Sequence, residues 1–437
     1  MTSLLDATPE SFVDELLRHN IHRVYLVPDA RTGSIAASHP FVQPLASFFD
    51  DPGSGYAGHE AVFLAIGPET HALFGAFVHT TTRGMAQGGL RHVPYESIAA
   101  FLRDGLRLSH AMARKSALAG LWWGGGKGVI ARQPGDAWHD RAYRDTLYHE
   151  YGQFVTSLRG CFVAAEDAGT NVDDMAAVFR ATRFATCIPP ALGGSGNPSV
   201  ITARGVVVAM EAALDHLGRG TLEGKRVAIE GLGNVGGPMV GFLLERGVAS
   251  VVAADIAPDR VQAIRERHAG QPVEARLVGP GNHDVLAEPC DIVAPNGLGG
   301  VLNAETIPRI QAPIVCGAAN NQLDDETRDA AALRDRGITF VPDFVCNRMG
   351  IVNCANEQYG YPVPDPAIER HLGREWEHGI YQATRRVLTL AATEGITTNE
   401  AATTLADALA REPHPIWPGR GREIVRTLVG EGWATGE

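Results

Sequence analysis

The sequence predicts an α/β protein that contains a Rossmann-type dinucleotide-binding domain in its second half. Strand and helix signals alternate along most of the chain, which is typical of this class. A Gly-rich turn at residues 231–236 follows one strand and opens a helix. Two further short strands, in residues 291–300 and 313–322, run into turns rich in Gly and Asn. Such turns are expected where a parallel sheet faces a cofactor.

The Gly-rich turn has the pattern G-x-G-x-x-G, and the strand that follows its helix ends in an acid. The first glycine permits the tight turn, the second lets a pyrophosphate approach the backbone, and the third lets the helix pack on the strand. The helix N-terminus then faces the phosphates. FAD and S-adenosylmethionine remain alternatives to NAD at this level. The predicted cofactor-binding residues here are Gly231, Gly233, Asn234, Val235, Gly236 and Asp255.

The first half of the chain has its own α/β pattern. Thr8 and Pro9 predict the N-cap and first residue of a helix that ends near residue 18. Strands are expected at residues 22–28, 61–66 and 72–79. The paired glycines Gly88 and Gly89 predict a turn, explained equally well by a bound ligand or by a tight bend. A helix should start near Ser97, with a buried face made of Ile98, Leu102, Gly105, Ser109 and Met112.

Lysine is rare in this chain, which has only Lys115, Lys127 and Lys225. Two of the three lie in residues 112–130, around a triple glycine that should end the helix, so that Lys127 opens a short strand. Arginine cannot deprotonate, whereas a desolvated lysine can act as a base near neutral pH. The placement therefore favours a chemical role over two ordinary surface lysines.

Two adjacent acids, Glu166 and Asp167, follow an expected strand at residues 161–165. Acids at the end of a strand are often catalytic, although Asp167 could also cap the next helix, for which Asn171 is an equally good cap. Residues 189–198 are rich in Gly and Pro and form the best candidate linker.

Composition excludes several classes of protein. The net charge of −12 argues against nucleic-acid binding. No apolar run reaches the roughly 18 residues that a membrane span needs, and no signal peptide is visible at the N-terminus. The six cysteines form no CxxC pair, so neither a metal site nor a disulfide framework is expected. A reducing, cytoplasmic setting fits this composition best.

Seven motifs in order make the chain resemble the Glu/Leu/Phe/Val family of amino-acid dehydrogenases. They are residues 88–91, 112–130, 166–170, 194–199, 231–236 with Asp255, 318–323 and 342–343. The resemblance implies a substrate domain at residues 1–196, a Rossmann-type NAD domain at 197–350, and a helical segment at 351–437 that returns to the first domain. It also implies catalysis between the domains, a homo-oligomer, and NAD-dependent conversion of an L-amino acid to the 2-oxo acid and ammonia.

The same resemblance assigns roles to individual residues. Lys127 would be the general base that activates water, and Asp167 would relay protons to and from the amino group. Lys115 would bind the substrate carboxylate. The other implied substrate-binding residues are Gln87, Gly88, Gly89, Met112, Ile351 and Cys354. Thr202, Asn321 and Asn347 would hold the nicotinamide end of the cofactor.

Two departures from the family pattern bear on specificity. Residues 347–350 read Asn-Arg-Met-Gly where the family usually has Asn-Ala-Gly-Gly, so Arg348 and Met349 add bulk and charge close to the cleft. Gln87 stands where glutamate dehydrogenases tend to have lysine and leucine-type enzymes an apolar residue. A buried carboxylate without a cation costs several kcal/mol, so a substrate with an uncharged side chain is expected. The alternatives are a glutamate dehydrogenase and a non-catalytic dinucleotide-binding regulator, and the intact Lys115, Lys127 and Asp167 argue against the regulator.

Overall fold

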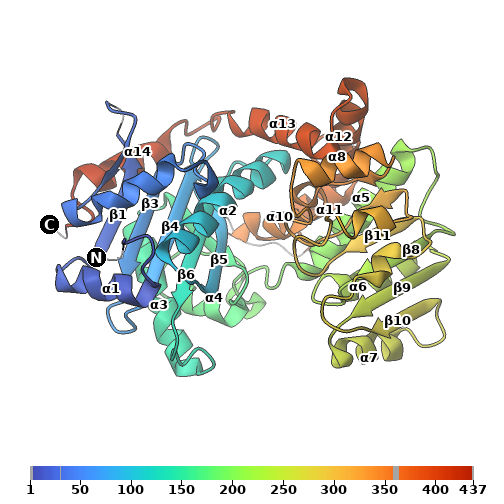
Figure 1. The fold of residues 1–437 in the computed structure, drawn as a ribbon, viewed down its shortest axis with the longest axis horizontal. Helices are drawn as coiled ribbons and strands as arrows, with labels where there is room; N and C mark the ends of the chain where they lie inside the picture. Colours follow the sequence, from blue (N-terminus) through green and yellow to red (C-terminus); the bar gives the residue numbers. More distant parts are fainter. Residues whose placement is uncertain (1–2, 30, 358–363, 436–437) are drawn as a thin grey trace. The chain divides into compact units, whose positions relative to one another are not determined.

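The computed structural model describes residues 3–29, 31–357 and 364–435, which form two compact units. The first unit comprises residues 1–197, 354–361 and 408–437, and the second comprises residues 198–353 and 362–407. Figure 1 colours the chain by sequence and labels its helices and strands. The C-terminal part of the chain is therefore shared between the two units. The functional limits 1–196, 197–350 and 351–437 stay a prediction, because these units are defined by contacts alone.

A seven-stranded mixed sheet forms the centre of the first unit, in the order β2-β1-β3-β4-β6-β5-β7. β1, β3, β4 and β6 pair antiparallel, and β5 runs parallel to both of its neighbours, β6 and β7. The strands are β1 Arg23–Pro28, β2 Ile35–Ala37, β3 Ala61–Ile66, β4 Leu73–Thr80, β5 Ala86–Pro94, β6 Gly124–Arg132 and β7 Phe162–Glu166.

Helices cover both faces of this sheet. On one face Phe12, Phe77 and Phe101 belong to a core built with α1 and α2, and on the other Phe74 and Tyr151 belong to a core built with α3. The predicted N-cap is confirmed, because the Thr8 side chain accepts a hydrogen bond from the backbone of α1. The helices are α1 Pro9–Arg18, α2 Ile98–Leu118, α3 Arg141–Ser157, α4 Val172–Phe179 and α14 Arg420–Gly430.

The glycines of the first unit lie inside strands, which corrects two expectations. Gly88 and Gly89 are in β5 rather than in a turn, and the triple glycine begins β6, with Lys127 inside that strand. Close backbone packing explains the choice of residue, since a Cβ on Gly88 would lie 1.7 Å from the Gly126 carbonyl oxygen. The helix α2 has already ended at Leu118, before the triple glycine.

The buried face of α2 also differs from the expected one near its C-terminus. The predicted stripe is correct as far as Ser109, which is fully buried. Met112 is only half-buried, and the stripe continues instead through Ala113 and Ser116. Met112 is thus left partly accessible, one turn before the half-buried Lys115.

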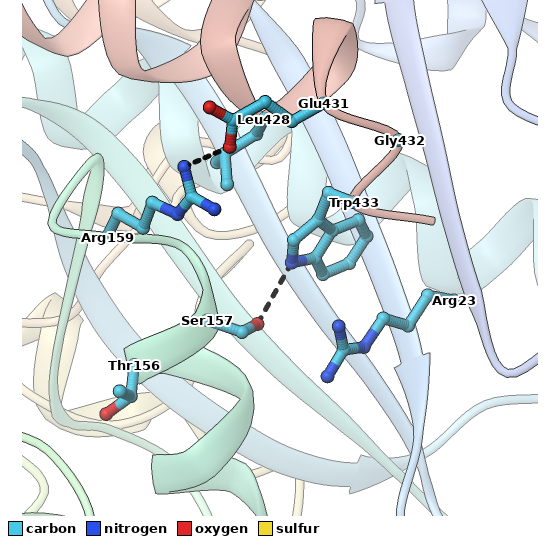
Figure 2. Close-up of a pocket in the computed structure, with 8 residues that line it drawn as sticks. All are labelled: Arg23, Thr156, Ser157, Arg159, Leu428, Glu431, Gly432 and Trp433. Carbon is cyan, nitrogen blue, oxygen red and sulfur yellow. Dashed lines mark hydrogen bonds and ion pairs between the residues drawn. The ribbon is translucent and has the colours of Figure 1, made fainter. Parts of the chain in front are cut away.

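The last residues of the described chain are built into the first unit (Figure 2). The indole Nε1 of Trp433 donates a hydrogen bond to Ser157 Oγ at 3.1 Å, and its ring centroid lies 5.1 Å from that of Phe63. Arg159 and Glu431 form an ion pair of 2.5 Å beside it. The segment after α14 therefore closes the core between the sheet and α3.

The second unit is a Rossmann fold with a parallel, six-stranded sheet in the order β10-β9-β8-β11-β12-β13. Counted from its first strand, this order is 3-2-1-4-5-6, the one associated with dinucleotide binding. The strands are β8 Arg226–Glu230, β9 Ser250–Asp255, β10 Val273–Leu277, β11 Ile292–Pro295, β12 Ile314–Val315 and β13 Thr339–Phe340. The α/β class and the Rossmann prediction are both confirmed.

Helices flank this parallel sheet, and several of them follow its last strand (Figure 1). The helices wholly within this unit are α5 Ser199–His216, α6 Gly236–Glu245, α7 Pro258–Arg267, α8 Arg328–Asp335, α9 Asp343–Cys346, α11 Pro366–Leu372 and α12 Ile380–Glu394. Two others, α10 Met349–Ala355 and α13 Thr398–Ala410, begin in this unit and end in residues of the first. Within the described parts of the chain, no helix combines the length and apolar character needed to cross a membrane.

Candidate functional site

Three neighbouring strands of the first unit bring Lys127, Asp167 and Arg91 together. Lys127, in β6, is only 4% exposed, and its Nζ donates a hydrogen bond to Asp167 Oδ2, just beyond β7. Arg91 Nε, from β5, donates to the same oxygen at 3.2 Å. One carboxylate oxygen is thus bound by two cations, one of which is buried.

A second acid holds Arg91 in this position. Arg91 Nη1 donates to both carboxylate oxygens of Asp104, on α2, at 3.1 Å. The Tyr95 hydroxyl donates to Asp104 Oδ2 at 2.7 Å. The cluster therefore alternates in charge from Lys127 through Asp167 and Arg91 to Asp104, which fixes the guanidinium against Asp167.

The environment shifts the pKa values of Lys127 and Asp167 in the directions that base catalysis requires. Burial lowers the pKa of Lys127, Arg91 lowers it further, and Asp167 opposes the shift. Burial alone would raise the pKa of Asp167, but Lys127 and Arg91 outweigh it and hold that pKa below its usual range. At neutral pH the carboxylate stays charged, while the lysine gives up its proton more easily than a free lysine.

Replacing Arg91 by methionine should move the acidic limb of the activity profile to higher pH. The guanidinium lowers the pKa of Lys127, so its removal raises that pKa and delays formation of the neutral base. Arg91→Lys, which keeps a positive charge, should shift the limb less. The measurement is kcat/KM against pH for the three proteins. A shift of the limb to lower pH in Arg91→Met would contradict this account of the cluster.

Backbone contacts fix Asp167 and remove the alternative that it caps a helix. The Asp167 backbone N–H donates to Thr170 Oγ1 at 2.9 Å, and that hydroxyl donates to the Leu90 carbonyl oxygen of β5 at 3.0 Å. Asn171 caps α4 instead, through a reciprocal capping box. The Asp167 side chain is therefore left for Lys127 and Arg91.

Glu166 differs from its neighbour in charge. Its Oε1 accepts a hydrogen bond from Asn197 Nδ2 at 3.3 Å. Burial raises the pKa of Glu166 to about 7, with the charges of Asp174 and Asp167 adding to the shift. Of the two adjacent acids, Asp167 is fully charged at neutral pH and Glu166 is only partly charged, so Asp167 is the better counter-charge for a lysine.

The other predicted substrate residues of the first unit lie on the same three elements or close to them. Gly89 packs against Asp167, since a Cβ on it would lie 2.6 Å from the Asp167 Cβ. Gln87 is 1% exposed, and its Nε2 lies 3.5 Å from Cys354 Sγ. Lys115 is in the last turn of α2. Ile351 lies one turn before Cys354 in the helix α10 Met349–Ala355 and is assigned to the second unit.

The Gly-rich turn of the second unit fits a dinucleotide. A Cβ on Gly236 would lie 1.9 Å from the Gly231 carbonyl oxygen, so the helix packs tightly against the turn. At Gly233 a Cβ would meet only Arg260 Nη1, at 3.7 Å, which leaves open the side where a pyrophosphate would approach. Asp255 Oδ2 accepts a hydrogen bond from the Leu232 backbone at 2.6 Å. The predicted acid is therefore tied directly to the glycine turn.

The predicted nicotinamide residues also lie in the second unit. Thr202 Oγ1 would be 3.3 Å from a Cβ on Gly350. Asn347 Nδ2 donates to the Ala318 carbonyl oxygen at 3.0 Å and to Asn320 Oδ1 at 2.8 Å. The Asn347 Oδ1 atom is buried without a hydrogen-bond partner among the described residues. Asn347 is thus held in place by its Nδ2 while its Oδ1 can still accept a hydrogen bond, as is expected of a residue that binds the carboxamide of a nicotinamide.

Comparisons with known proteins agree with this geometry. Residues 193–408 match the sequence model described as Glutamate/Leucine/Phenylalanine/Valine dehydrogenase, and residues 71–184 match the model Glu/Leu/Phe/Val dehydrogenase, dimerisation domain. The chain is 40% identical to leucine dehydrogenase of Bacillus subtilis (strain 168) over 331 residues, which cover 76% of this chain and 85% of that one. The chain belongs to the Glu/Leu/Phe/Val dehydrogenase family.

Other members of the family are similar to it at comparable levels. Valine dehydrogenase of Streptomyces coelicolor is 38% identical over 365 residues, which cover 83% of this chain and 95% of that one. The crystal structure of L-tryptophan dehydrogenase from Nostoc punctiforme is 33% identical, covers 81% of this chain and 96% of its own, and superposes with a TM-score of 0.66. The chain is therefore an amino-acid dehydrogenase, an oxidoreductase that acts on CH–NH2 groups, as the sequence predicted.

The departure from the family at Arg348 and Met349 turns out to be internal to the second unit. Both side chains are fully buried there, at 0% exposure. Arg348 Nη2 donates to the His378 carbonyl oxygen at 2.7 Å. Arg348 thus binds the backbone just before α12 and does not face solvent, while its position near the cleft stays a prediction.

Sequence reasoning gave no role to Arg91, and it missed Asp104 and Tyr95, which hold Arg91 beside Asp167. Arg91 carried a signal, because it closes the Gly88–Arg91 motif two positions after Gly89 and so shares its face of the strand. The sequence carried no signal for Asp104 and Tyr95, because Asp104 of α2 meets Arg91 of β5 only in the folded protein and Tyr95 binds Asp104. Among the described side chains, no group of three or more His, Cys, Asp or Glu is arranged to hold a metal ion.

Proposed function

We propose that this protein catalyses the reversible, NAD-dependent oxidative deamination of an L-amino acid with an uncharged side chain, giving the 2-oxo acid and ammonia. The observation that carries the proposal is the buried Lys127, bound to Asp167, in a chain whose second unit has a Gly-rich turn fit for a dinucleotide. The relatives at 38–40% identity that are named leucine and valine dehydrogenases support the uncharged substrate.

Each residue of the site has a task in this reaction. Lys115 pairs its ammonium with the substrate carboxylate. Asp167 accepts a proton from the amino group, and Lys127, once neutral, takes a proton from the water that attacks the imine carbon. Arg91 keeps Asp167 charged and in place. Bound NAD supplies the hydride acceptor for the substrate α-carbon, and Thr202, Asn321 and Asn347 orient its nicotinamide end.

The class of substrate side chain follows from the residues proposed to surround it, which are Gln87, Met112, Ile351 and Cys354. Gln87 is buried and neutral, so it offers no full charge to a distal carboxylate. Arg348, the other candidate cation, donates to a backbone carbonyl within the second unit. Glutamate is therefore the less favoured alternative.

A panel of L-amino acids tests the function directly. NADH formation should be seen with one or more aliphatic, aromatic or neutral polar amino acids at alkaline pH, and kcat/KM for glutamate should be lower. The cofactor-bound state is checked separately by NADH fluorescence. Folded protein that binds NADH and oxidises none of the panel would refute the proposal, and a preference for glutamate over every neutral amino acid would refute the substrate class.

The cofactor should be NAD rather than NADP. Asp255 would accept hydrogen bonds from the ribose hydroxyls and repel a 2′-phosphate, and repulsion of this kind is worth roughly tenfold or more. Arg260, whose Nη1 lies 3.7 Å from Asp255 Oδ2, weakens the repulsion without removing it. The measurement is kcat/KM with each cofactor for the wild type and for Asp255→Ala, in which the ratio should fall towards one. Equal values for the wild-type enzyme would contradict the assignment.

Assembly and setting complete the proposal. The match to a dimerisation-domain model supports a homo-oligomer. Free thiols at all six cysteines support a reducing, cytoplasmic setting. Light scattering of the purified protein would give the number of subunits.

A further inference from the structure

The amide of Gln87 lies on the same sheet face as the catalytic residues of the first unit. Gln87 is paired in register with Gly125 of β6, two residues before Lys127. It also precedes by two residues Gly89, which packs against Asp167. Side chains two positions apart on a strand point to the same side. Gln87 therefore shares its face with both members of the Lys127–Asp167 pair.

One half of this amide is already bound. Gln87 Nε2 donates to the sulfur of Cys354 at 3.5 Å. The thiol of Cys187 is hydrogen-bonded to Cys354, which together with burial raises the pKa of Cys187 well above its usual range. Both cysteines are 2% exposed or less, and the raised pKa of Cys187 keeps that thiol protonated. The two thiols thus fix the orientation of the amide through its nitrogen.

The other half of the amide is not bound by the protein. Gln87 Oε1 is a buried acceptor, and no hydrogen-bond donor among the described residues reaches it. The neighbouring Val163, beside it in β7, belongs to an apolar cluster with Trp123 and Ala355. A buried acceptor that stays unsatisfied is unfavourable, so native structures rarely keep one without a ligand or a water to fill the role.

We propose that Gln87 Oε1 accepts a hydrogen bond from the side chain of the substrate. The substrate class is then an L-amino acid whose neutral side chain carries an N–H or O–H donor, such as a primary amide, a hydroxyl or an indole. This inference rests on the proposed function and narrows it, because a purely aliphatic substrate would leave the acceptor unsatisfied. A site built around a hydrogen bond discriminates strongly against analogues that lack the donor.

Two pairs of matched substrates test the donor directly in the wild-type enzyme. The first pair is 5-hydroxy-L-norvaline and L-norleucine, in which a hydroxyl replaces a methyl group. The second pair is L-tryptophan and its benzothiophene analogue, in which sulfur replaces the indole N–H. In at least one pair kcat/KM should favour the donor by about 5- to 150-fold, the range expected for one unsatisfied buried group.

Variants assign the preference to Gln87. Gln87→Met keeps the length of the side chain without the amide, and it should bring the ratio of the favoured pair close to one or reverse it. Gln87→Leu serves as a second variant, and thermal unfolding shows whether each is folded. The matched control is Gln153→Met, an exposed glutamine on α3, which should leave the ratio unchanged.

The outcomes separate this inference from the proposed function. The inference is overturned if the enzyme oxidises neutral amino acids but kcat/KM is equal within both pairs, or is higher for the analogues without a donor. The dehydrogenase assignment then stays intact. A donor preference that survives in folded Gln87→Met and Gln87→Leu also overturns it. Absence of oxidation of every amino acid in the panel overturns the proposed function and this inference with it.

Discussion

Lys127→Ala is expected to lower turnover by at least about 10²–10⁴-fold, the contribution of a well-placed general base. The buried ammonium is bound by Asp167, and burial lowers the pKa of the lysine, which is the combination that a base needs. NADH binding should persist, since Lys127 is in the first unit and the Gly-rich turn is in the second. The measurements are single-turnover kinetics and an NADH fluorescence titration.

The rarity of lysine in this chain supplies the control. Lys225→Ala changes a half-buried lysine just before β8 and should leave kcat within about twofold of the wild type, as is usual for changes away from a site. Lys127→Arg should be as inactive as Lys127→Ala, because arginine keeps the charge but cannot deprotonate. Residual activity of Lys127→Ala above about one hundredth of the wild type would exclude Lys127 as the base.

The second large effect is expected at Gly236. A Cβ there would lie 1.9 Å from the Gly231 carbonyl oxygen, so Gly236→Ala must push the helix α6 away from the turn. Overpacking of this kind typically costs about 1–3 kcal/mol, and it would also displace the backbone that faces the cofactor phosphates. NADH affinity and the thermal midpoint should therefore both fall.

Another glycine of the same helix gives a matched comparison. A Cβ on Gly241 would meet only His268 Cε1, at 3.9 Å, which is an ordinary contact. Gly241→Ala should therefore stabilise the helix by about 0.5–1 kcal/mol and leave NADH binding unchanged. If the two alanine variants bind NADH equally well, close packing at Gly236 is not what shapes the site.

The second unit was largely predictable because its signals are local. A strand, three spaced glycines, a helix and Asp255 follow one another within one short stretch, and the physics that relates them acts over that distance. Asn171 and Thr8 were predictable for the same reason, as caps act on the next turn of helix.

The first unit was harder to predict because its glycines are required by contacts with residues that are distant in the sequence. Position 88 must be glycine because the backbone of Gly126, in another strand, leaves no room for a Cβ. The sequence around Gly88 does not show whether its glycine serves close packing or a turn. The ion pair of Arg91 with Asp104 likewise joins a strand to a helix. Arg348 is buried against the segment before α12, where it binds the His378 carbonyl oxygen. The residues next to Arg348 in the sequence give no sign of this contact.

The position of Trp433 has a consequence for how the protein is made. Trp433 is synthesised only after the second unit, yet its ring packs against Phe63, from β3, and its indole binds Ser157. Until Trp433 is made, the sheet of the first unit therefore lacks this contact, and the ring of Phe63 is left without the aromatic partner that covers it. Contacts between residues far apart in the sequence form slowly, and exposed apolar surface promotes aggregation in the meantime. Replacing Trp433 by alanine should thus reduce the yield of soluble protein more than the activity of each molecule that folds.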